Sequence, residues 1–326
     1  MASTILVTGG AGYIGSHMVR HLCDAGETVV VVDDLSSGHA KAVDARASFY
    51  VCAVNDAPRM KQLLGDHGVT DVVHFAARIR VEESVKDPAR YYEGNLRTSL
   101  AFLESCIDAK VARFVFSSTA AVYGAPLVSP IPEDHVLSPL NPYGFTKFAF
   151  ERALADFGAA YGLHSVALRY FNAAGANVEA GLRECHDPET HLIPLALEAA
   201  RGTRSGFSIF GTDYDTKDGT CVRDYVHVMD LARAHECALR WMKTSQEPTN
   251  RFAAFNVGSG EGASVREVLA CIERVTGHTV AATESPRRPG DPAVLVADIS
   301  RAKRDLGWSP SRSSLETIIE DAWRAK

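Results

Sequence analysis

Tyr143 and Lys147 are four residues apart in the segment Pro142-Tyr143-Gly144-Phe145-Thr146-Lys147. On a helix this spacing puts both side chains on one face, so a phenol lies beside an ammonium group. Free tyrosine titrates near ~10, and a neighbouring cation favours the phenolate. Bringing the phenol towards neutrality takes roughly 4 kcal/mol, supplied by Lys147 and a positively charged cofactor ring. The pair is suited to moving a proton on and off a substrate hydroxyl.

Three hydroxyl side chains end an apolar segment upstream of this pair. Residues 113–119 read Arg-Phe-Val-Phe-Ser-Ser-Thr, which predicts a buried strand closed by Ser117, Ser118 and Thr119. We expect the hydroxyl of Ser118 or Thr119 to hydrogen-bond the same substrate oxygen as Tyr143. Tyr-x-x-x-Lys alone is common by chance, so this interpretation depends on the fold around it.

The N-terminal residues supply that fold. An apolar run at 4–8 is followed by a glycine loop, a segment with helical apolar spacing at 16–25, and a second apolar run ending in Asp33. Gly10-x-Gly12-x-x-Gly15 lets the backbone approach a pyrophosphate, and the helix N-terminus offers free N–H groups. Asp33 can accept hydrogen bonds from an adenosine ribose, whereas Asp33 and Asp34 would repel a 2′-phosphate. We therefore predict a dinucleotide site that favours NAD over NADP.

The strand–helix rhythm continues well beyond this unit. Strands are expected at 47–51, 70–77 and 113–119, with helices at 57–64, 88–109 and from Pro142 onward. This alternation predicts an α/β fold with a Rossmann-type, doubly wound parallel sheet and a site at the carboxyl ends of its strands. After residue 172 the rhythm loosens. We expect a dinucleotide-binding domain over 1–172, with return segments near 226–257, and a smaller α/β substrate lobe over 173–326.

Composition narrows the classes of partner. The net charge is −6, and no apolar run of about twenty residues occurs, so neither nucleic acid nor a membrane is an expected partner. Seven cysteines are scattered without a Cys-x-x-Cys pair or a His/Cys cluster at metal spacing. We therefore expect reduced thiols, a cytoplasmic location and no metal.

Several longer motifs carry a family resemblance. The Gly9-x-x-Gly12-x-x-Gly15 loop together with Tyr143-x-x-x-Lys147 resembles the extended short-chain dehydrogenase/reductase family. Within that family the chain is similar to the UDP-glucose 4-epimerases from residue 4 to about residue 310. The motifs that carry this similarity are residues 8–17 (TGGAGYIGSH), 74–77 (HFAA), 117–124 (SSTAAVYG), 168–172 (LRYFN) and 218–228 (DGTCVRDYVHV).

The resemblance implies a role for each matching position. Tyr143 would move the C4 proton, Thr119 and Ser118 would steady the C4 oxygen, and Lys147 would bind the nicotinamide ribose. The residues implied around NAD are Gly9, Gly12, Tyr13, Ile14, Gly15, Asp33, Asp34, Leu35, Ser36, Ser37, Gly38, Ala53, Val54, Phe75, Ala76, Ala77, Ile79, Asn95, Ser117, Tyr143, Lys147 and Phe171. Those implied around a UDP-sugar are Thr119, Tyr143, Asn172, His191, Leu192, Ser208, Phe210, Arg223, Arg288, Asp291 and Leu295. A homodimer through the two long helices is also implied.

Departures from the family pattern leave alternatives open. Cys52-Ala53 replaces the family's Gly-Asp, Ile79 stands where some members have lysine, and His191 replaces asparagine. Leu295 is intermediate in size at the position that sets pocket width, so UDP-N-acetylglucosamine remains a possible substrate.

Residues near the predicted site also bear on the alternative activities. Arg78 and Arg80 add positive charge that would suit UDP-glucuronate, whereas Ala120 and Ala121 lack the carboxylates that dehydratases place there. An NAD-binding regulator without catalysis is the alternative from another functional class, and the intact Tyr143/Lys147 pair argues against it.

Overall fold

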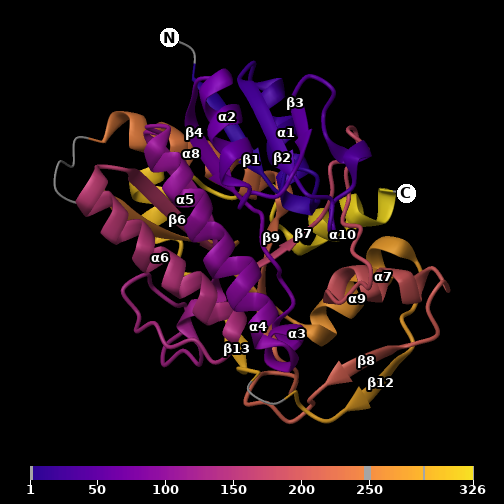
Figure 1. The fold of residues 1–326 in the computed structure, drawn as a ribbon. Helices are drawn as coiled ribbons and strands as arrows, with labels where there is room; N and C mark the ends of the chain where they lie inside the picture. Colours follow the sequence, from indigo (N-terminus) through magenta and orange to yellow (C-terminus); the bar gives the residue numbers. More distant parts are fainter. Residues whose placement is uncertain (1–2, 246–250, 289–290, 326) are drawn as a thin grey trace.

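A seven-stranded parallel sheet forms the centre of the computed structural model, which describes residues 3–245, 251–288 and 291–325 (Figure 1). The strand order is β10-β6-β5-β4-β1-β2-β3. The bounds are β1 Thr4–Thr8, β2 Thr28–Asp33, β3 Ser48–Val51, β4 Val69–His74, β5 Arg113–Thr119, β6 His164–Tyr170 and β10 Phe252–Val257. The order reverses between β1 and β4, and parallel sheets bind ligands at such a switch point. The predicted doubly wound Rossmann-type sheet is confirmed.

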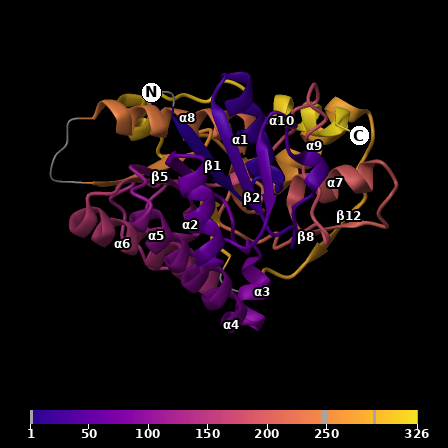
Figure 2. The ribbon, with the colours of Figure 1, turned by 45° about the horizontal axis from the view of Figure 1, so that its top comes forward.

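Helices cover both faces of this sheet (Figure 2). α1 (Tyr13–Asp24) and α8 (Val228–Thr244) pack on one face, and α2 (Ala57–Asp66), α5 (Thr98–Asp108) and α6 (Pro142–Tyr161) pack on the other. The strands are β-branched and apolar because both of their faces are buried: Val30, Val31 and Val32 are fully inaccessible. Two buried clusters, one on each face, hold the sheet rigid beneath the site.

Helix α6 begins at a defined residue, which fixes Tyr143 and Lys147 in its first turns. The side chain of Asn141 accepts a hydrogen bond from the N–H of Gly144 at 2.9 Å, and Pro142 occupies the first helical position. The helix ends at Gly162, whose φ of +78° lies in the left-handed region.

The helix expected over 88–109 is present but not uniform. Its parts are α4 (Pro88–Tyr91), a π-helical turn η2 (Tyr92–Arg97) and α5. The preceding short helix is α3 (Val81–Lys86), and shorter turns occur at η1 (Ala40–Ala42), η3 (Ala120–Tyr123) and η4 (Ala302–Leu306).

The remaining elements build a second, smaller lobe beside the carboxyl edge of the sheet (Figure 1). Its helices are α7 (Leu192–Ala200), α9 (Val265–Thr276) and α10 (Leu315–Arg324). Its strands are β7 (Asn172–Ala174), β8 (Phe207–Phe210), β9 (Val222–His227), β11 (Gly262–Ser264), β12 (Ala282–Ser285) and β13 (Val294–Leu295). A capping box between Ser264 and Glu267 begins α9. The apolar stripe of α10 packs into the core of this lobe, with Ile318 and Ile319 fully buried.

Asp224 joins this lobe to the sheet. Its buried carboxylate on β9 accepts hydrogen bonds from the backbone of Ser259 at 2.6 Å and Gly260 at 3.1 Å, just after β10. It also accepts one from the backbone of Ala297 at 3.1 Å, beyond β13. One side chain thus holds three chain segments together, which fixes β9 and β13 relative to the end of the main sheet.

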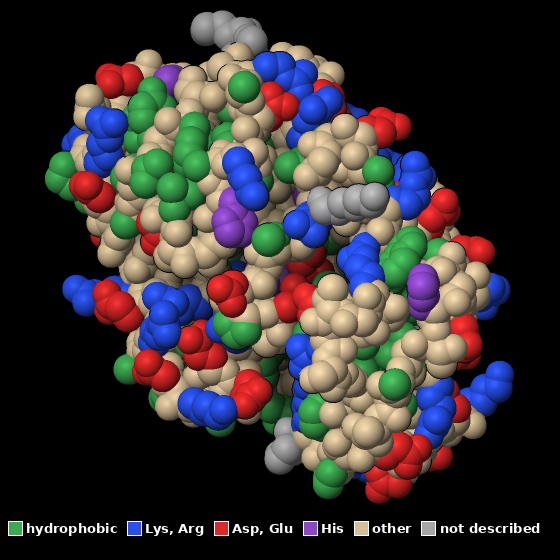
Figure 3. Space-filling model, turned by 90° about the vertical axis from the view of Figure 1, so that its right-hand side faces the viewer, with side chains coloured by type: hydrophobic (Ala, Val, Ile, Leu, Met, Phe, Trp, Pro, Cys, Tyr) green, Lys and Arg blue, Asp and Glu red, His purple; other side chains and the backbone are tan. Residues whose placement is uncertain are grey.

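The surface carries charges of both signs. Lys and Arg side chains are interspersed with Asp and Glu side chains over the face at the right of Figure 1 (Figure 3). No helix among the described residues combines the length and the apolar character needed to cross a lipid bilayer.

Candidate active site

Tyr143, Thr119 and Lys147 meet at the carboxyl end of β5. The side chain of Thr119 lies beside the phenol of Tyr143 and lowers its pKa. Lys147 is buried one helical turn further along α6, and its Nζ donates to the carbonyl oxygen of Ser117 at 2.8 Å. The same Nζ lies 5.9 Å from the centre of the Tyr143 ring. A phenol, a hydroxyl and an amine thus converge on one point above the sheet edge.

The electrostatics of Tyr143 differ from the expectation based on sequence. Burial raises the pKa of its phenol above the ordinary value, and the hydrogen bond from Thr119 offsets only part of this. Lys147 was expected to lower that pKa, but its own ammonium is desolvated. In the protein alone Tyr143 is therefore protonated near neutral pH, and a further positive charge is needed to make it a base.

Lys147 is itself strongly perturbed. Burial lowers the pKa of its ammonium to about 7, against a partial upward effect of Glu151. The surroundings of the Nζ are mainly aromatic, with the ring centre of Phe116 at 4.8 Å. A lysine in this setting can bind a polar ligand group strongly, because few other partners compete for its protons.

Ser118 does not join this cluster, which corrects the interpretation of its hydroxyl as a substrate contact. Successive residues of a strand point to opposite faces. Ser118 therefore donates to Glu151 on the far side, where Glu151 forms a buried ion pair with Arg169 at 2.6 Å. Ser117 points the other way and its hydroxyl bonds that of Tyr170. Ser118 is a structural residue that secures the end of β5 to α6.

The glycine loop fits a dinucleotide on its own geometry. A Cβ on Gly15 would lie 2.1 Å from the carbonyl oxygen of Gly9, and one on Gly9 would lie 2.7 Å from the backbone nitrogen of Ala76. Side chains are thus excluded where the loop packs against helix α1 and the end of β4. No side chain caps the first turn of α1 after Gly12, which leaves its N–H groups for an anion such as a pyrophosphate.

Asp33 stabilises two loops at the predicted dinucleotide site. Its carboxylate accepts from the backbone N–H of Ala11 at 2.9 Å and of Leu35 at 2.8 Å, so it orders both the glycine loop and the loop after β2. A carboxylate has about four acceptor positions, so capacity for a ribose diol remains. Gly38 packs directly on Ala11, where a Cβ would approach to 2.9 Å. The other residues of this loop implied for NAD are Asp34, Ser36 and Ser37.

The loops that follow β3 and β4 carry the next residues implied around NAD. Asn95 accepts from the backbone N–H of Arg78 at 2.7 Å and donates to its carbonyl oxygen at 2.9 Å, which clamps the loop after β4. The ring of Phe75 contacts that of buried His235 in a tilted arrangement, with ring centres 4.7 Å apart. The remaining residues implied here for NAD are Ala76, Ala77 and exposed Ile79 after β4, exposed Ala53 and buried Val54 after β3, and Tyr13 and Ile14 in the first turn of α1.

A basic group in the second lobe faces this edge. Arg223, mostly buried on β9, pairs with Asp291 at 2.5 Å. The backbone N–H of Asp291 donates to the carbonyl oxygen of Arg288 at 3.3 Å, which brings these two residues together. The guanidinium of Arg288 lies 4.2 Å from the ring centre of Phe210. Ser208, two residues from Phe210 on β8, shares its strand face.

Leu295 lies between the residues around Thr119 and the basic group that contains Arg223. It pairs with Arg223 in the β13–β9 ladder, and it packs against the cluster that contains Ala120, next to Thr119. Phe171 packs on that cluster as well. Asn172 donates to the carbonyl oxygen of Asp224 at 2.9 Å. Leu295 therefore lies between the segment that follows β5 and the β9 strand that carries Arg223.

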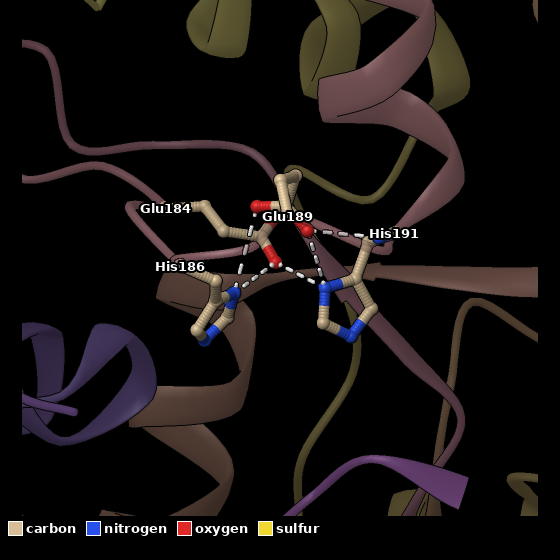
Figure 4. Close-up of side chains that lie close together, drawn as sticks. All are labelled: Glu184, His186, Glu189 and His191. Atoms are coloured by element: carbon tan, nitrogen blue, oxygen red, sulfur yellow. Dashed lines mark hydrogen bonds and ion pairs between the residues drawn. The ribbon is translucent and has the colours of Figure 1, made fainter. Parts of the chain in front are cut away.

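His191 takes a different position from the substrate contact that the sequence predicted. Its Nδ1 lies 2.9 Å from Glu189 and 2.8 Å from Glu184, in a cluster that also holds His186 (Figure 4). The next residue, Leu192, begins α7 and packs on the core of the second lobe. The sequence reasoning missed this cluster because it searched for cysteine and histidine pairs, and the signal was Glu-x-His-x-x-Glu-x-His.

Comparison with known proteins agrees with this geometry. A model of the NAD dependent epimerase/dehydratase family matches residues 5–258. The UDP-glucose 4-epimerase of Lacticaseibacillus casei is 48% identical over 320 residues, which are 98% of this chain and 96% of the relative. The crystal structure of UDP-glucose 4-epimerase from Brucella ovis in complex with NAD has a TM-score of 0.95 at 44% identity, covering 99% of this chain and 98% of that one.

A further structure has a broader named activity. The UDP-Glc/GlcNAc 4-epimerase from Campylobacter jejuni has a TM-score of 0.87 at 38% identity, with 99% of this chain and 98% of that chain covered. Sequence, fold and site geometry therefore agree, and the chain belongs to the NAD-dependent epimerase/dehydratase family, among the UDP-glucose 4-epimerases.

Proposed function

We propose that this chain, an NAD-dependent isomerase, interconverts UDP-galactose and UDP-glucose by inverting C4 through a transient 4-keto sugar, with Tyr143 as its acid–base group. The observation that carries this proposal is the placement of the Tyr143 phenol beside Thr119 and 5.9 Å from the buried amine of Lys147. When bound beside the substrate, NAD would supply the reversible hydride chemistry that inversion at C4 needs.

The chain's own residues divide the remaining work. Thr119 orients the C4 oxygen, and the phenol oxygen of Tyr143 takes the hydroxyl proton and later returns it. The raised pKa of Tyr143 in the protein alone makes this step conditional: the phenol becomes a base only when a positive charge sits beside it. Lys147, bound to the carbonyl oxygen of Ser117, holds the ribose next to that ring.

The second lobe holds the nucleotide diphosphate. Arg223 and Arg288 are permanently charged and can bind diphosphate oxygens with paired hydrogen bonds. In the free protein Asp291 neutralises Arg223, so a diphosphate competes with that carboxylate. Phe210 offers its ring to the uracil, with Asn172, Leu192 and Ser208 around the nucleotide. A sugar held through its diphosphate can rotate and present the opposite face of C4 without leaving the site.

Leu295 sets how wide the sugar pocket is. It packs beside the β5 end, close to where C4 must lie, and its side chain is smaller than an aromatic ring. The Campylobacter jejuni structure is named for both glucose and N-acetylglucosamine substrates, which keeps UDP-N-acetylglucosamine as a second candidate. Arg80 is less available to bind the carboxylate of a uronic acid, because its guanidinium already donates a hydrogen bond to the carbonyl oxygen of Asp187 at 2.7 Å.

The test is a chromatographic assay of C4 epimers with UDP-galactose, UDP-N-acetylgalactosamine and UDP-galacturonate. Wild type is expected to convert UDP-galactose, and Tyr143→Phe to lose at least about a hundredfold in kcat. Tyr161→Phe, an exposed phenol on the same helix, is the matched control and is expected to be fully active. Conversion of none of the sugars, with NAD still bound, would favour a regulator.

A homodimer in the cytoplasm completes the proposal. Tyr92 and Phe145 are 40% and 43% exposed, and their rings contact each other across the α4–α5 segment and α6. Covering these aromatic side chains with the same helices of a second copy would remove apolar surface from water. All seven cysteines are free thiols, which supports a reducing compartment.

A further inference from the structure

Four potential metal ligands converge in the loop that precedes α7. Glu184, His186, Glu189 and His191 each direct one ligand atom to a common centre, and these atoms all lie within 4.8 Å of one another (Figure 4). The two imidazoles present Nδ1 and the two glutamates present a carboxylate oxygen. All four come from eight consecutive residues, so the local fold of one loop builds the whole cluster.

The spacing of the ligand atoms matches a four-coordinate metal. The Nδ1 of His186 lies 3.1 Å and 3.6 Å from Glu184 and Glu189, and the Nδ1 of His191 lies 2.8 Å and 2.9 Å from the same two carboxylates. Zinc bonds of about 2.0–2.2 Å in a tetrahedron place neighbouring ligands roughly 3.3–3.6 Å apart. To hold such an ion, the closest His–Glu pairs need to open by a few tenths of an ångström, and the most widely separated ligand atoms, which are up to 4.8 Å apart, need to close by about one ångström.

The carboxylates of the cluster are more shielded from solvent than its imidazoles. The side chains of Glu184 and Glu189 are 7% and 9% exposed, whereas those of His186 and His191 are 19% and 42% exposed. The Nδ1 of His186 is buried and has no well-directed hydrogen bond among the described residues, although it faces both carboxylates. Buried carboxylates need a cation, and a buried ring nitrogen needs a partner.

We infer that Glu184, His186, Glu189 and His191 form a binding site for a divalent transition metal, with Zn²⁺ as the ion whose ligand preference and geometry fit best. Imidazole and carboxylate are both zinc ligands, and four protein ligands leave no open position for catalysis. The site is therefore structural. It revises the expectation from sequence that the chain binds no metal.

The loop held by this ion contacts the dinucleotide-binding half at three places. The ring of His186 meets that of Tyr13, at the start of α1, edge-on with centres 6.3 Å apart. The backbone of Cys185 lies 3.2 Å from the Nε2 of His39, and the backbone of Asp187 accepts from Arg80. A metal that fixes the loop would keep it seated beside the glycine loop, so loss of the metal should also weaken retention of NAD.

An ion-pair cluster without metal is the competing account. In that state hydrogen bonds to Glu184 and Glu189 outweigh burial and raise the pKa of His186 to about 9 and that of His191 to about 10. Two imidazolium ions would then balance two carboxylates. The accounts differ in a measurable way, because a bound metal displaces both protons and is present in the purified protein.

The experiment is metal analysis of the full chain, purified without chelator and with any affinity tag removed. About one zinc per chain is expected after dialysis, together with a fall in thermal stability when dipicolinate strips the metal. Reloading with Co²⁺ should give the strong visible absorption of a four-coordinate ion. His186→Gln and Glu189→Gln should each weaken the zinc affinity more than about a hundredfold.

His39→Gln is the matched control, because His39 contacts the same loop without being a ligand, and it should retain the metal. Metal well below one ion per chain in wild type after incubation with Zn²⁺ would overturn the proposal in favour of the ion-pair cluster. Equal metal content in wild type and His186→Gln would also overturn it. The wild-type content decides the matter even where a variant fails to fold.

Discussion

Replacing Lys147 by methionine should stabilise the protein while abolishing its activity. Lys147 is 3% exposed, and methionine retains a similar unbranched stem without the ammonium group. Burial depresses the pKa of this ammonium from 10.5 to about 7. The folded state therefore binds fewer protons than the unfolded chain between these two values, so stability rises with pH across that window.

The structure gives the size of this effect. The full shift corresponds to about 5 kcal/mol against folding well below pH 7, and at pH 7 about 4 kcal/mol remains. Methionine removes this cost but leaves the carbonyl oxygen of Ser117 without its donor, which costs about 1–3 kcal/mol. We expect Lys147→Met to be more stable by about 2 kcal/mol at pH 7, and this advantage to vanish near pH 9 and to reverse by pH 10, where the wild-type penalty has fallen to about 1 kcal/mol.

Urea unfolding of the NAD-free proteins at several pH values measures this difference. Wild type and variant share every other titrating group, so their difference isolates Lys147. A variant that is less stable at pH 7, or a difference that does not change between pH 7 and pH 10, would refute the reasoning. The epimerase assay on the same samples should show nearly complete loss of activity, since no amine then holds the ribose.

Three further predictions concern other parts of the molecule. Glu151→Leu leaves the guanidinium of Arg169 buried without its partner, so the free energy of unfolding should fall by about 3–5 kcal/mol in urea titration, and an unchanged midpoint would contradict this. Gly15→Ala would force a contact with the backbone of the glycine loop and should abolish NAD binding, measured by fluorescence titration, whereas Gly65→Ala meets no atom within 4 Å and should bind NAD as wild type does. Phe145→Asp places a charge in the proposed dimer contact and should yield monomers in light scattering, and a dimer of unchanged stability would show that the interface lies elsewhere.

The sheet and the glycine loop could be predicted because local sequence determines them. Runs such as Thr28–Asp33 are apolar on both faces, and only a central parallel strand buries both. The predicted strand 113–119 is confirmed at both ends as β5, whose own terminal residues, Arg113 and Ser117 to Thr119, are polar and bound the apolar run. Asn141 and Pro142 likewise fix the start of α6, which brings Tyr143 to the sheet edge.

What could not be predicted depends on contacts between distant residues. The sequence predicted that Ser118 would contact the substrate oxygen because Ser118 lies at the end of the strand that carries Thr119. Strand alternation instead turns the hydroxyl of Ser118 towards Glu151 on α6. The pKa of Tyr143 depends on burial by several elements, which the Tyr-x-x-x-Lys spacing does not reveal. The direction of His191 follows from the fold of its loop, whereas resemblance indicated only its position in the sequence.

The measurement that tests the central claim most directly is the reaction of wild type with UDP-galactose in D₂O, followed by NMR of C4 in the product. If a hydride leaves C4 and returns from the enclosed cofactor, the UDP-glucose formed keeps its original hydrogen at C4, and only hydroxyl protons exchange. Deuterium at C4 of the product would mean that this carbon is deprotonated to solvent. In that case Tyr143, Thr119 and Lys147 would not perform the chemistry assigned to them.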